Sequence, residues 1–177
     1  MNKKAKVADI IHFGNNLLRT RGTPVTVFHK GLHHKIDIIS NTLKNHGGAA
    51  LAASQISMLK QIIVIDYLGE YYELINPEII EQSGEHTDTE GCLSLPNFWG
   101  NVSRFEKVIV KYQDRFGESH TVEKKGQMAR CFQHEIDHLN GILYIDRMND
   151  EYVFNDITKK KLSVKYLLDL TGQQPST

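Results

Sequence analysis

The chain has 177 residues, of which 40% are hydrophobic and 24% charged, a length and composition typical of one soluble globular domain. Its 21 Lys and Arg residues balance 21 Asp and Glu residues, which argues against a protein that binds DNA through an overall positive field. Two cysteines are too few for a disulfide scaffold, and no apolar run approaches the roughly 20 residues that a membrane helix needs. We therefore expect a cytoplasmic protein with no membrane partner.

The first half of the chain predicts one helix and one hairpin. Apolar residues at helical spacing favour a helix over residues 33–46, which Gly47 and Gly48 would end. Two β-rich runs, 61–67 and 71–76, flank the sequence Leu-Gly-Glu, which is a typical hairpin signal.

The second half predicts another hairpin and two helices. An alternating run at 108–113 turns through Arg-Phe-Gly into a second run at 119–122. Residues 126–140 carry an apolar stripe at helical spacing, and residues 156–170 carry another near the end of the chain. We therefore expect an α+β fold, and we assign the whole chain, 1–177, to a single catalytic domain.

The strongest local signal is the pentapeptide His-Glu-Ile-Asp-His at 134–138. Two histidines four residues apart lie on one helical face and can bind a single divalent ion through their imidazole nitrogens. The ion lowers the pKa of bound water from about 16 toward 7, and Glu135 can take a proton from that water. The pattern predicts a metal-dependent hydrolase, although H-E-x-x-H also arises by chance on surface helices.

A catalytic ion of this kind needs a third protein ligand. In zinc proteases the pattern continues to a third histidine, but here Tyr144 stands at that position, after a matching Gly141. Glu151 is a carboxylate farther downstream, beyond the expected end of the helix. Cys92 lies in a polar stretch between β-rich segments, and its thiolate would complete a Cys/His/His set with a fourth position open for water. We favour Cys92, and a metalloprotease is the alternative.

Two neighbours of the histidines are expected to have supporting roles. Cys131 precedes His134 by three residues on the apolar stripe, where a free cysteine typically packs as a small buried hydrophobic residue. Asp137 lies between the two histidines and is expected to orient a neighbouring group or the helix rather than bind the ion.

The segment 47–55 is rich in glycine and alanine and ends in Ser-Gln. Small residues let another backbone approach closely, and the amide of Gln55 can donate a hydrogen bond to a developing oxyanion. Alternatively, the small residues only permit tight helix packing and Gln55 is exposed. The segment alone leaves both interpretations open.

Taken together, three segments of the chain resemble the motifs of the peptide deformylase family. These motifs are G-x-G-x-A-A-x-Q, E-G-C-x-S and H-E-x-D-H. The last two match in full at 90–94 and 134–138, and the first matches at 48–55 except that Ala50 replaces its second glycine. The order and spacing of the motifs also agree, and the likeness extends from about residue 17 to residue 146.

The resemblance implies an α+β fold in which antiparallel hairpins and sheets pack around a central metal-binding helix, followed by a C-terminal helix. It implies that the chain removes the formyl group from the N-terminal formylmethionine of newly made polypeptides and releases formate. One divalent ion per chain is expected, Fe²⁺ in the native enzyme, with Ni²⁺, Co²⁺ and Zn²⁺ as alternatives. By the family's pattern, the ion binds Cys92, His134 and His138, Glu135 is the general base and acid, and Gln55 and the backbone N–H of Leu93 hold the oxyanion.

The resemblance also implies where the substrate lies. An extended peptide is expected to pair as an added strand with the backbone around the first two motifs, with its methionine side chain near the helix that leads into 134–138. Arg130 is polar for such a pocket, so it either contributes its aliphatic stem or is a solvated residue at the rim. The methyl group of Ala50 would narrow the cleft or strain the turn if the family's glycine serves close approach or a positive φ. The residues expected to bind the substrate are Gly48, Ala49, Ala50, Glu90, Gly91, Gln127, Arg130 and Cys131.

Three further points stay open on the sequence. A catalytically silent homologue or a ribosome-binding module would keep a metal site without the reaction, although Glu135 argues against it. The lysine-rich run at 159–165 allows a transient contact with the ribosome, or it is simply a solvated face. Trp99 either lines the mouth of the cleft or packs on the core.

Overall fold

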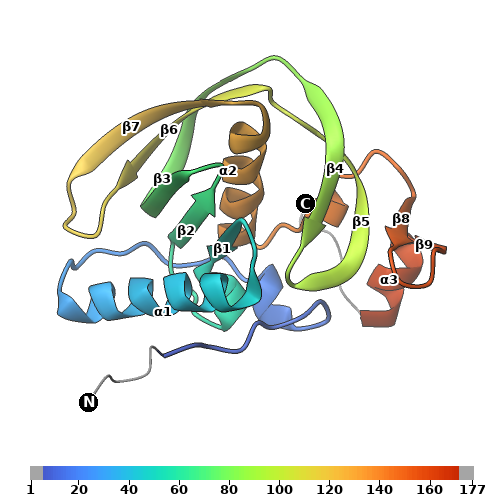
Figure 1. Ribbon diagram of the computed structural model, residues 1–177, viewed down its shortest axis with the longest axis horizontal. Coiled ribbons are helices and arrows are strands. Elements are labelled where there is room, and N and C mark those ends of the chain that lie inside the picture. The colour runs from blue at the N-terminus through green and yellow to red at the C-terminus, as the bar shows by residue number, and fades with distance from the viewer. Residues whose placement is uncertain (1–5, 172–177) are drawn as a thin grey trace.

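Two antiparallel sheets and three α-helices make up residues 6–171, the part of the chain that the computed structural model describes (Figure 1). The helices are α1 (Lys30–His46), α2 (Gly126–Leu139) and α3 (Val164–Thr171). The strands are β1 (Ala50–Ala52), β2 (Ile62–Tyr67), β3 (Glu70–Ser83), β4 (His86–Cys92), β5 (Leu95–Arg104), β6 (Lys107–Gln113), β7 (Ser119–Lys125), β8 (Tyr152–Asn155) and β9 (Lys161–Ser163). No helix within this range is long and apolar enough to cross a membrane.

Helix α2 lies between the two sheets (Figure 1). The first sheet has the strand order β1-β2-β3-β6-β7, and the second has the order β4-β5-β8-β9. Strands β1 and β4 are therefore edge strands of their sheets, and each lies beside α2. This arrangement leaves the free edges of both strands close to the helix that carries the His-Glu-Ile-Asp-His sequence.

Strand β2 explains why helices cover both faces of the first sheet. Its residues 62–65 are all apolar and completely buried. Ile62 and Val64 pack with α1, whereas Ile63 and Ile65 pack with α2. Successive side chains of a strand point to opposite faces, so an unbroken apolar run is what a strand between two helices requires. Burial of each such side chain contributes about 1.5–3 kcal/mol.

A third apolar cluster packs on the second sheet, beyond the end of α2. Leu95 and Val102 of β5 and Val153 of β8 meet Leu18 and the buried 3₁₀ turn Tyr144–Asp146 in this cluster. The side chain of Tyr144 is 2% exposed, and its hydroxyl donates to a backbone carbonyl of β5. The position at which a zinc protease would carry its third histidine is therefore part of the core.

Both predicted hairpins are confirmed. In the first, Tyr67 pairs with Glu70, and the two turn residues, Leu68 and Gly69, have φ angles of 52° and 79°. Positive φ at both positions is what the tightest turn between antiparallel strands requires. The β6–β7 hairpin turns at Asp114, whose carboxylate accepts two backbone N–H groups of the turn. The sequence did not predict the long β4–β5 hairpin, because β4 is largely polar and gives no apolar alternation.

The predicted helix over 156–170 is wrong in its first half. Asn155 ends β8, and its side-chain oxygen accepts the backbone N–H groups of Ile157 and Thr158. Lys159 then adopts a left-handed φ of 57°, and β9 pairs with β8 before α3 begins at Val164. An Asx-type turn therefore interrupts the apolar spacing, and the first lysines of the 159–165 run lie on a turn rather than on a helix.

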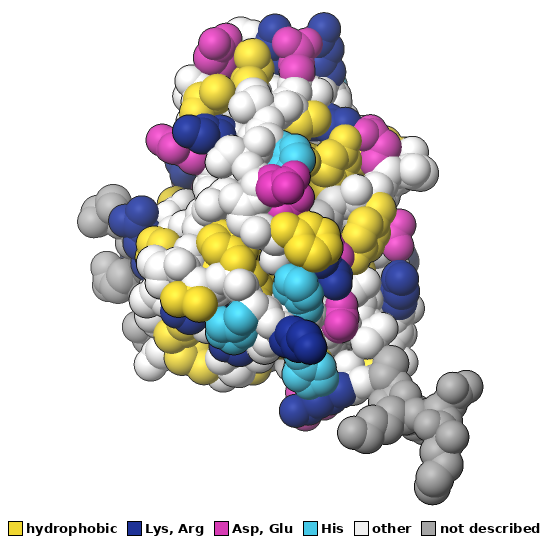
Figure 2. Space-filling view, turned by 90° about the vertical axis from the view of Figure 1, so that its left-hand side faces the viewer, with side chains coloured by type: hydrophobic (Ala, Val, Ile, Leu, Met, Phe, Trp, Pro, Cys, Tyr) yellow, Lys and Arg dark blue, Asp and Glu magenta, His cyan; other side chains and the backbone are white. Residues whose placement is uncertain are grey.

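Acidic and basic side chains are interspersed on the face of the molecule drawn in Figure 2. Hydrophobic and histidine side chains lie among them, and no extended patch of one sign is visible on this face. This mixture agrees with the equal numbers of acidic and basic residues in the sequence.

Candidate active site

The site forms where the end of β4 meets the second half of α2. Helix α2 presents His134 and His138, which are one turn apart, toward the two-residue turn that joins β4 to β5. Cys92 is the last residue of β4 and pairs with Leu95 across that turn. The helix and the hairpin thus bring together residues that are more than 40 positions apart in the chain.

The three side chains predicted as metal ligands form one cluster. The Cys92 sulfur lies 3.2 Å from Nε2 of His138, and one ligand atom from each of Cys92, His134 and His138 lies within 4.8 Å of the others. Thiolate and imidazole ligands bind a divalent ion at about 2.0–2.3 Å, so three donors at these separations can share one ion. The spacing and chemistry of the cluster therefore fit a divalent transition metal.

The electrostatics of the cluster favour the ligand form of the cysteine. Burial alone would raise the pKa of the Cys92 thiol, but His138 and His134 beside it lower that pKa well below its usual value. For His134 the opposite holds: burial alone would lower its pKa, but Cys92 and Glu90 raise it well above the usual value. The two histidines therefore favour the thiolate of Cys92, which is the form that binds metals.

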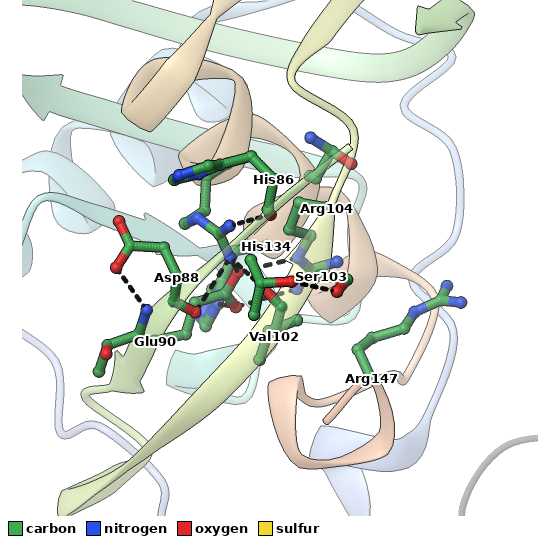
Figure 3. A network of polar contacts seen from close by, with 12 residues as sticks. His86, Asp88, Glu90, Val102, Ser103, Arg104, His134 and Arg147 are labelled. Atoms are coloured by element: carbon green, nitrogen blue, oxygen red, sulfur yellow. Dashed lines mark hydrogen bonds and ion pairs between the residues drawn. The ribbon is translucent and has the colours of Figure 1, made fainter. Parts of the chain in front are cut away.

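A buried ion-pair network fixes the orientation of His134 (Figure 3). Nδ1 of His134 lies 2.8 Å from a carboxylate oxygen of Glu90. Arg104 and Arg130 both donate to the same carboxylate, at 2.9 and 2.8 Å. Because Glu90 occupies Nδ1, the other ring nitrogen of His134 is left for the ion.

Asp137 belongs to the same network, which the sequence analysis did not predict. Its carboxylate accepts hydrogen bonds from Arg104 and from Arg147. Arg104 therefore joins Asp137 on α2 to Glu90 on β4. The sequence analysis did not identify Arg104, since the residue lies at the end of a strand that carries no recognisable motif.

Glu135 lies in the cleft without a polar partner. Its side chain is buried, with 5% of the residue exposed, and its Oε2 atom has no hydrogen-bond partner among residues 6–171. Burial raises the pKa of Glu135, an effect that His138 and His134 partly offset. A carboxylate with a raised pKa and a free oxygen can accept a proton and return it near neutral pH.

Gln55 is buried beside the cysteine, so the alternative that it is exposed is wrong. It is 1% exposed, and its Oε1 atom accepts the backbone N–H of Ala52 at 2.8 Å. This bond turns the side-chain NH₂ toward Ser94 Oγ at 3.2 Å and the Cys92 sulfur at 3.5 Å. A donor is therefore aimed at the metal-ligand cluster.

A cleft of about 330 Å³ opens over these residues. It is lined by every residue predicted to act in catalysis, metal binding or substrate binding except His138, which is buried behind the others. The sequence analysis missed two further residues of the lining, Tyr67 and Thr89. Thr89 immediately precedes the E-G-C-x-S motif, but neither residue has a spacing or charge that would have identified it.

The Ala50 substitution introduces no backbone strain. Ala50 lies in β1, pairs with Ile65, and is not among the residues with positive φ. The close approach occurs at Gly48 instead, where a Cβ atom would lie 2.7 Å from the side chain of Leu93. Gly48 therefore lets the first motif segment approach the second.

One of the two interpretations of Arg130, a solvated residue at the rim of the cleft, is wrong. It is 6% exposed, and its guanidinium is bonded to Glu90 and to backbone carbonyls of the β4–β5 hairpin. Trp99 packs against Phe154 of β8, with ring centroids 4.7 Å apart, and does not line the cleft. Glu151 is exposed just before β8, so the structure does not place this carboxylate among the buried ligands.

Comparison with known proteins gives a consistent result. The family model for polypeptide deformylase matches residues 7–153. A peptide deformylase of Heliobacterium modesticaldum is 45% identical over 82% of this chain and 96% of its own length. The structure of a Synechococcus elongatus peptide deformylase in complex with actinonin aligns with a TM-score of 0.81 and 33% identity over 97% of this chain and 89% of that chain. A Met-Ala-Ser-bound peptide deformylase of Acinetobacter baumannii has a TM-score of 0.78 and 31% identity over 82% of this chain and 100% of that chain.

Proposed function

The chain belongs to the peptide deformylase family, and we propose that the Cys92, His134 and His138 cluster holds the divalent ion with which it works. The chain is a hydrolase that removes the N-terminal formyl group from newly made polypeptides, with formyl-Met peptides as substrates and formate as product. A divalent ion bound there would act as a Lewis acid and would lower the pKa of water. The donor set and its separations support this assignment.

Glu135 is the proton carrier in this proposal. Its unpartnered oxygen lies in the cleft beside the ligand cluster. The carboxylate takes a proton from the attacking water and passes it to the amine that leaves when the formyl C–N bond breaks. This buried, unpaired oxygen beside three metal-ligating side chains is the observation that carries the assignment, because a purely structural metal site has no use for it.

Gln55 and Leu93 would stabilise the developing oxyanion. The side-chain NH₂ of Gln55 is held toward the cluster by the bond between its Oε1 and Ala52. Leu93 follows Cys92 directly and lines the same cleft. Two fixed donors at the reacting carbonyl cost no reorganisation when the charge appears.

The substrate backbone would lie between β1 and β4. Both are edge strands, so each has one side without a neighbouring strand in the described sheets. Ala49, Ala50 and Gly91 line the cleft along these two edges. An extended peptide can add to such an edge through main-chain hydrogen bonds.

We further propose Fe²⁺ as the native ion and the cytoplasm as the place of action. Cysteine and imidazole ligands suit several first-row metals, so the ligand set alone does not choose among Fe²⁺, Ni²⁺, Co²⁺ and Zn²⁺. The site needs a reduced cysteine, and cysteines stay reduced in the cytoplasm. The substrates, newly made polypeptides, are produced in the same compartment. Contact between the 159–165 run and the ribosome stays a prediction.

Formate release tests this function. Purified protein is loaded anaerobically with Fe²⁺ or with Ni²⁺, incubated with a formyl-Met peptide, and assayed for formate. We expect formate with both metals and none with metal-free protein. Absence of formate with both metals would contradict the proposal, and cleavage of internal peptide bonds would favour a protease instead.

A further inference from the structure

A second cavity lies where the first turns of α1 meet the start of β2 (Figure 1). Its volume is about 220 Å³, and none of the residues that line it also lines the active-site cleft. The buried part of its lining is apolar and consists of Val25, Leu32 and Ile62. Val27 adds an apolar side chain that is 62% exposed. The cavity therefore offers apolar surface to a molecule smaller than a typical drug-sized ligand.

The segment that carries Val25 is held in place by hydrogen bonds. The side chain of Asn76 accepts the backbone N–H of Val25 and donates to its carbonyl oxygen, each at 2.8 Å. Two residues earlier, Thr23 donates its N–H to the carbonyl of Leu59 and accepts the N–H of Gln61, each at 3.0 Å. This wall of the cavity is therefore formed before a ligand binds, which lowers the entropic cost of binding.

The charged side chains at the cavity are all basic. Lys35, Lys60 and His29 line it, and none of the described residues that line it is acidic. The ion pairs that lysines form within residues 6–171 involve other lysines, so Lys35 and Lys60 have no acidic partner there. The start of α1 is not itself the binding group, because His29 already accepts the backbone N–H groups of Gly31 and Leu32. Two unpaired cations beside an apolar surface favour an anion with an apolar body.

We propose that this cavity binds a short aliphatic carboxylate, with its chain on the buried apolar residues and its carboxylate at Lys35 and Lys60. A carboxylate only accepts hydrogen bonds, and an ammonium group only donates them, so the two are complementary in charge and in hydrogen bonding. The cavity takes the chain and leaves the charged group at the rim, whereas a lipid in a membrane keeps its chain in the bilayer. The ligand is therefore a free molecule in solution.

Titration with hexanoate tests the site. Protein loaded with diamagnetic Zn²⁺ and labelled with ¹⁵N is titrated, and the backbone amide shifts are followed by NMR. We expect saturable shifts at residues 25–35 and 60–62, with a Kd of about 1 mM. Butanoate lacks two methylene groups and should bind about tenfold more weakly. Hexylammonium has the same chain length and the opposite charge, and it should cause no saturable shifts at these residues.

Lysine variants assign the charge selection. Lys35→Gln and Lys60→Gln each remove one cation, and we expect each to raise the Kd for hexanoate about fivefold. Lys44→Gln is the matched control, because Lys44 is an exposed lysine of the same helix that does not line the cavity. Its Kd should equal that of the wild-type protein. Unchanged spectra of the free variants will show that each keeps its fold.

Three results would overturn the inference. Shifts confined to residues of the active-site cleft, such as Gly91 and Leu93, would show that hexanoate binds only there. Equal binding of hexylammonium at the cavity would exclude charge selection, and an unchanged Kd in both Lys35→Gln and Lys60→Gln would exclude the two cations. None of these measurements depends on formate release, so the inference and the proposed function can fail separately.

Discussion

At the scale of single residues, Cys92 carries the metal assignment. The sequence offered Cys92 as one of several third ligands, and the structure brings its sulfur to 3.2 Å from His138. Cys131 lines the same cleft, but burial raises its pKa well above the usual value, so it stays a neutral thiol. The two cysteines therefore differ in ligand character although they share one cleft.

Substitution of each cysteine tests this difference. We expect Cys92→Ala to lose the ion, because two histidines alone hold a divalent metal weakly, whereas Cys131→Ala should keep about one ion per chain. Metal content after gel filtration, measured by atomic absorption, checks both. One retained ion per chain in Cys92→Ala would show that the third ligand is another residue.

Glu90 makes a pH-dependent contribution to stability. Burial alone would raise its pKa, but hydrogen bonds from His134 and Arg104 hold the pKa below its ordinary value of 4.5. A carboxyl group whose pKa is lower in the folded than in the unfolded protein stabilises the fold above the unfolded pKa, and this contribution is lost as the pH falls toward the folded pKa.

The Glu90→Gln variant tests this contribution. At pH 7 we expect it to be less stable by about 3 kcal/mol, because it leaves buried arginine charge without its partner. The difference from wild type should narrow as the pH falls below about 4.5. Urea unfolding with a chelator present measures both proteins without a contribution from metal loss. A difference that stays constant from pH 7 down to about pH 2.5 would contradict the account.

The residues of the site were predictable to the extent that they lie in contiguous motifs. The three proposed metal ligands lie in short sequence motifs, and so do Glu135 and Gln55. Their chemistry can therefore be recognised without knowledge of the fold. Arg104 and Tyr67 are not predictable in this way, because only the fold brings Arg104 to Glu90 and Tyr67 to the cleft. The burial of Arg130 was missed for the same reason, since its partner Glu90 lies 40 positions away.

At the scale of elements, the end of α2 depends on a glycine. Gly141 follows the helix with a φ of 75°, and a Cβ atom there would lie 2.4 Å from the backbone oxygen of Arg19. Backbone cannot move aside as a flexible side chain can. This glycine therefore serves the return of the chain past Arg19, and its match to the zinc-protease pattern is coincidental.

Gly141→Ala should destabilise the fold by about 3 kcal/mol, because it combines a left-handed conformation with a steric clash. Gly47 is the matched control: it has a φ of 71° at the end of α1, but nothing lies within 4 Å of an added Cβ. Gly47→Ala should cost only about 1 kcal/mol. Equal losses in urea unfolding for the two variants would refute the clash at Gly141.

Elements with strong periodicity were predictable, and those with polar or interrupted patterns were not. The continuous apolar run of β2 predicts a strand, and the apolar stripe of α2 predicts a helix. Both patterns are clear because these apolar residues are buried on defined faces. Strand β4 is largely exposed, and its pairing with β5 gives it a partner that the local sequence does not reveal. In the C-terminal segment, the capping side chain of Asn155 overrides the helical spacing that follows it.

At the scale of the whole molecule, the cleft lies where the two sheets approach each other across α2. Three apolar clusters, one on α1, one on α2 and one on the second sheet, hold the frame around it. The equal numbers of acidic and basic residues fit a substrate that is bound through its backbone and its first side chain rather than through long-range charge.

The central claim is that Glu135 moves the proton in deformylation at the Cys92, His134 and His138 cluster. Formate release by Ni²⁺-loaded Glu135→Gln, compared with wild type at equal metal content, tests it most directly. We expect full metal occupancy and a loss of kcat by a factor of about 10²–10⁴, because the amide can neither take up nor return the proton. Formate release at the wild-type rate by the metal-loaded variant would contradict the account.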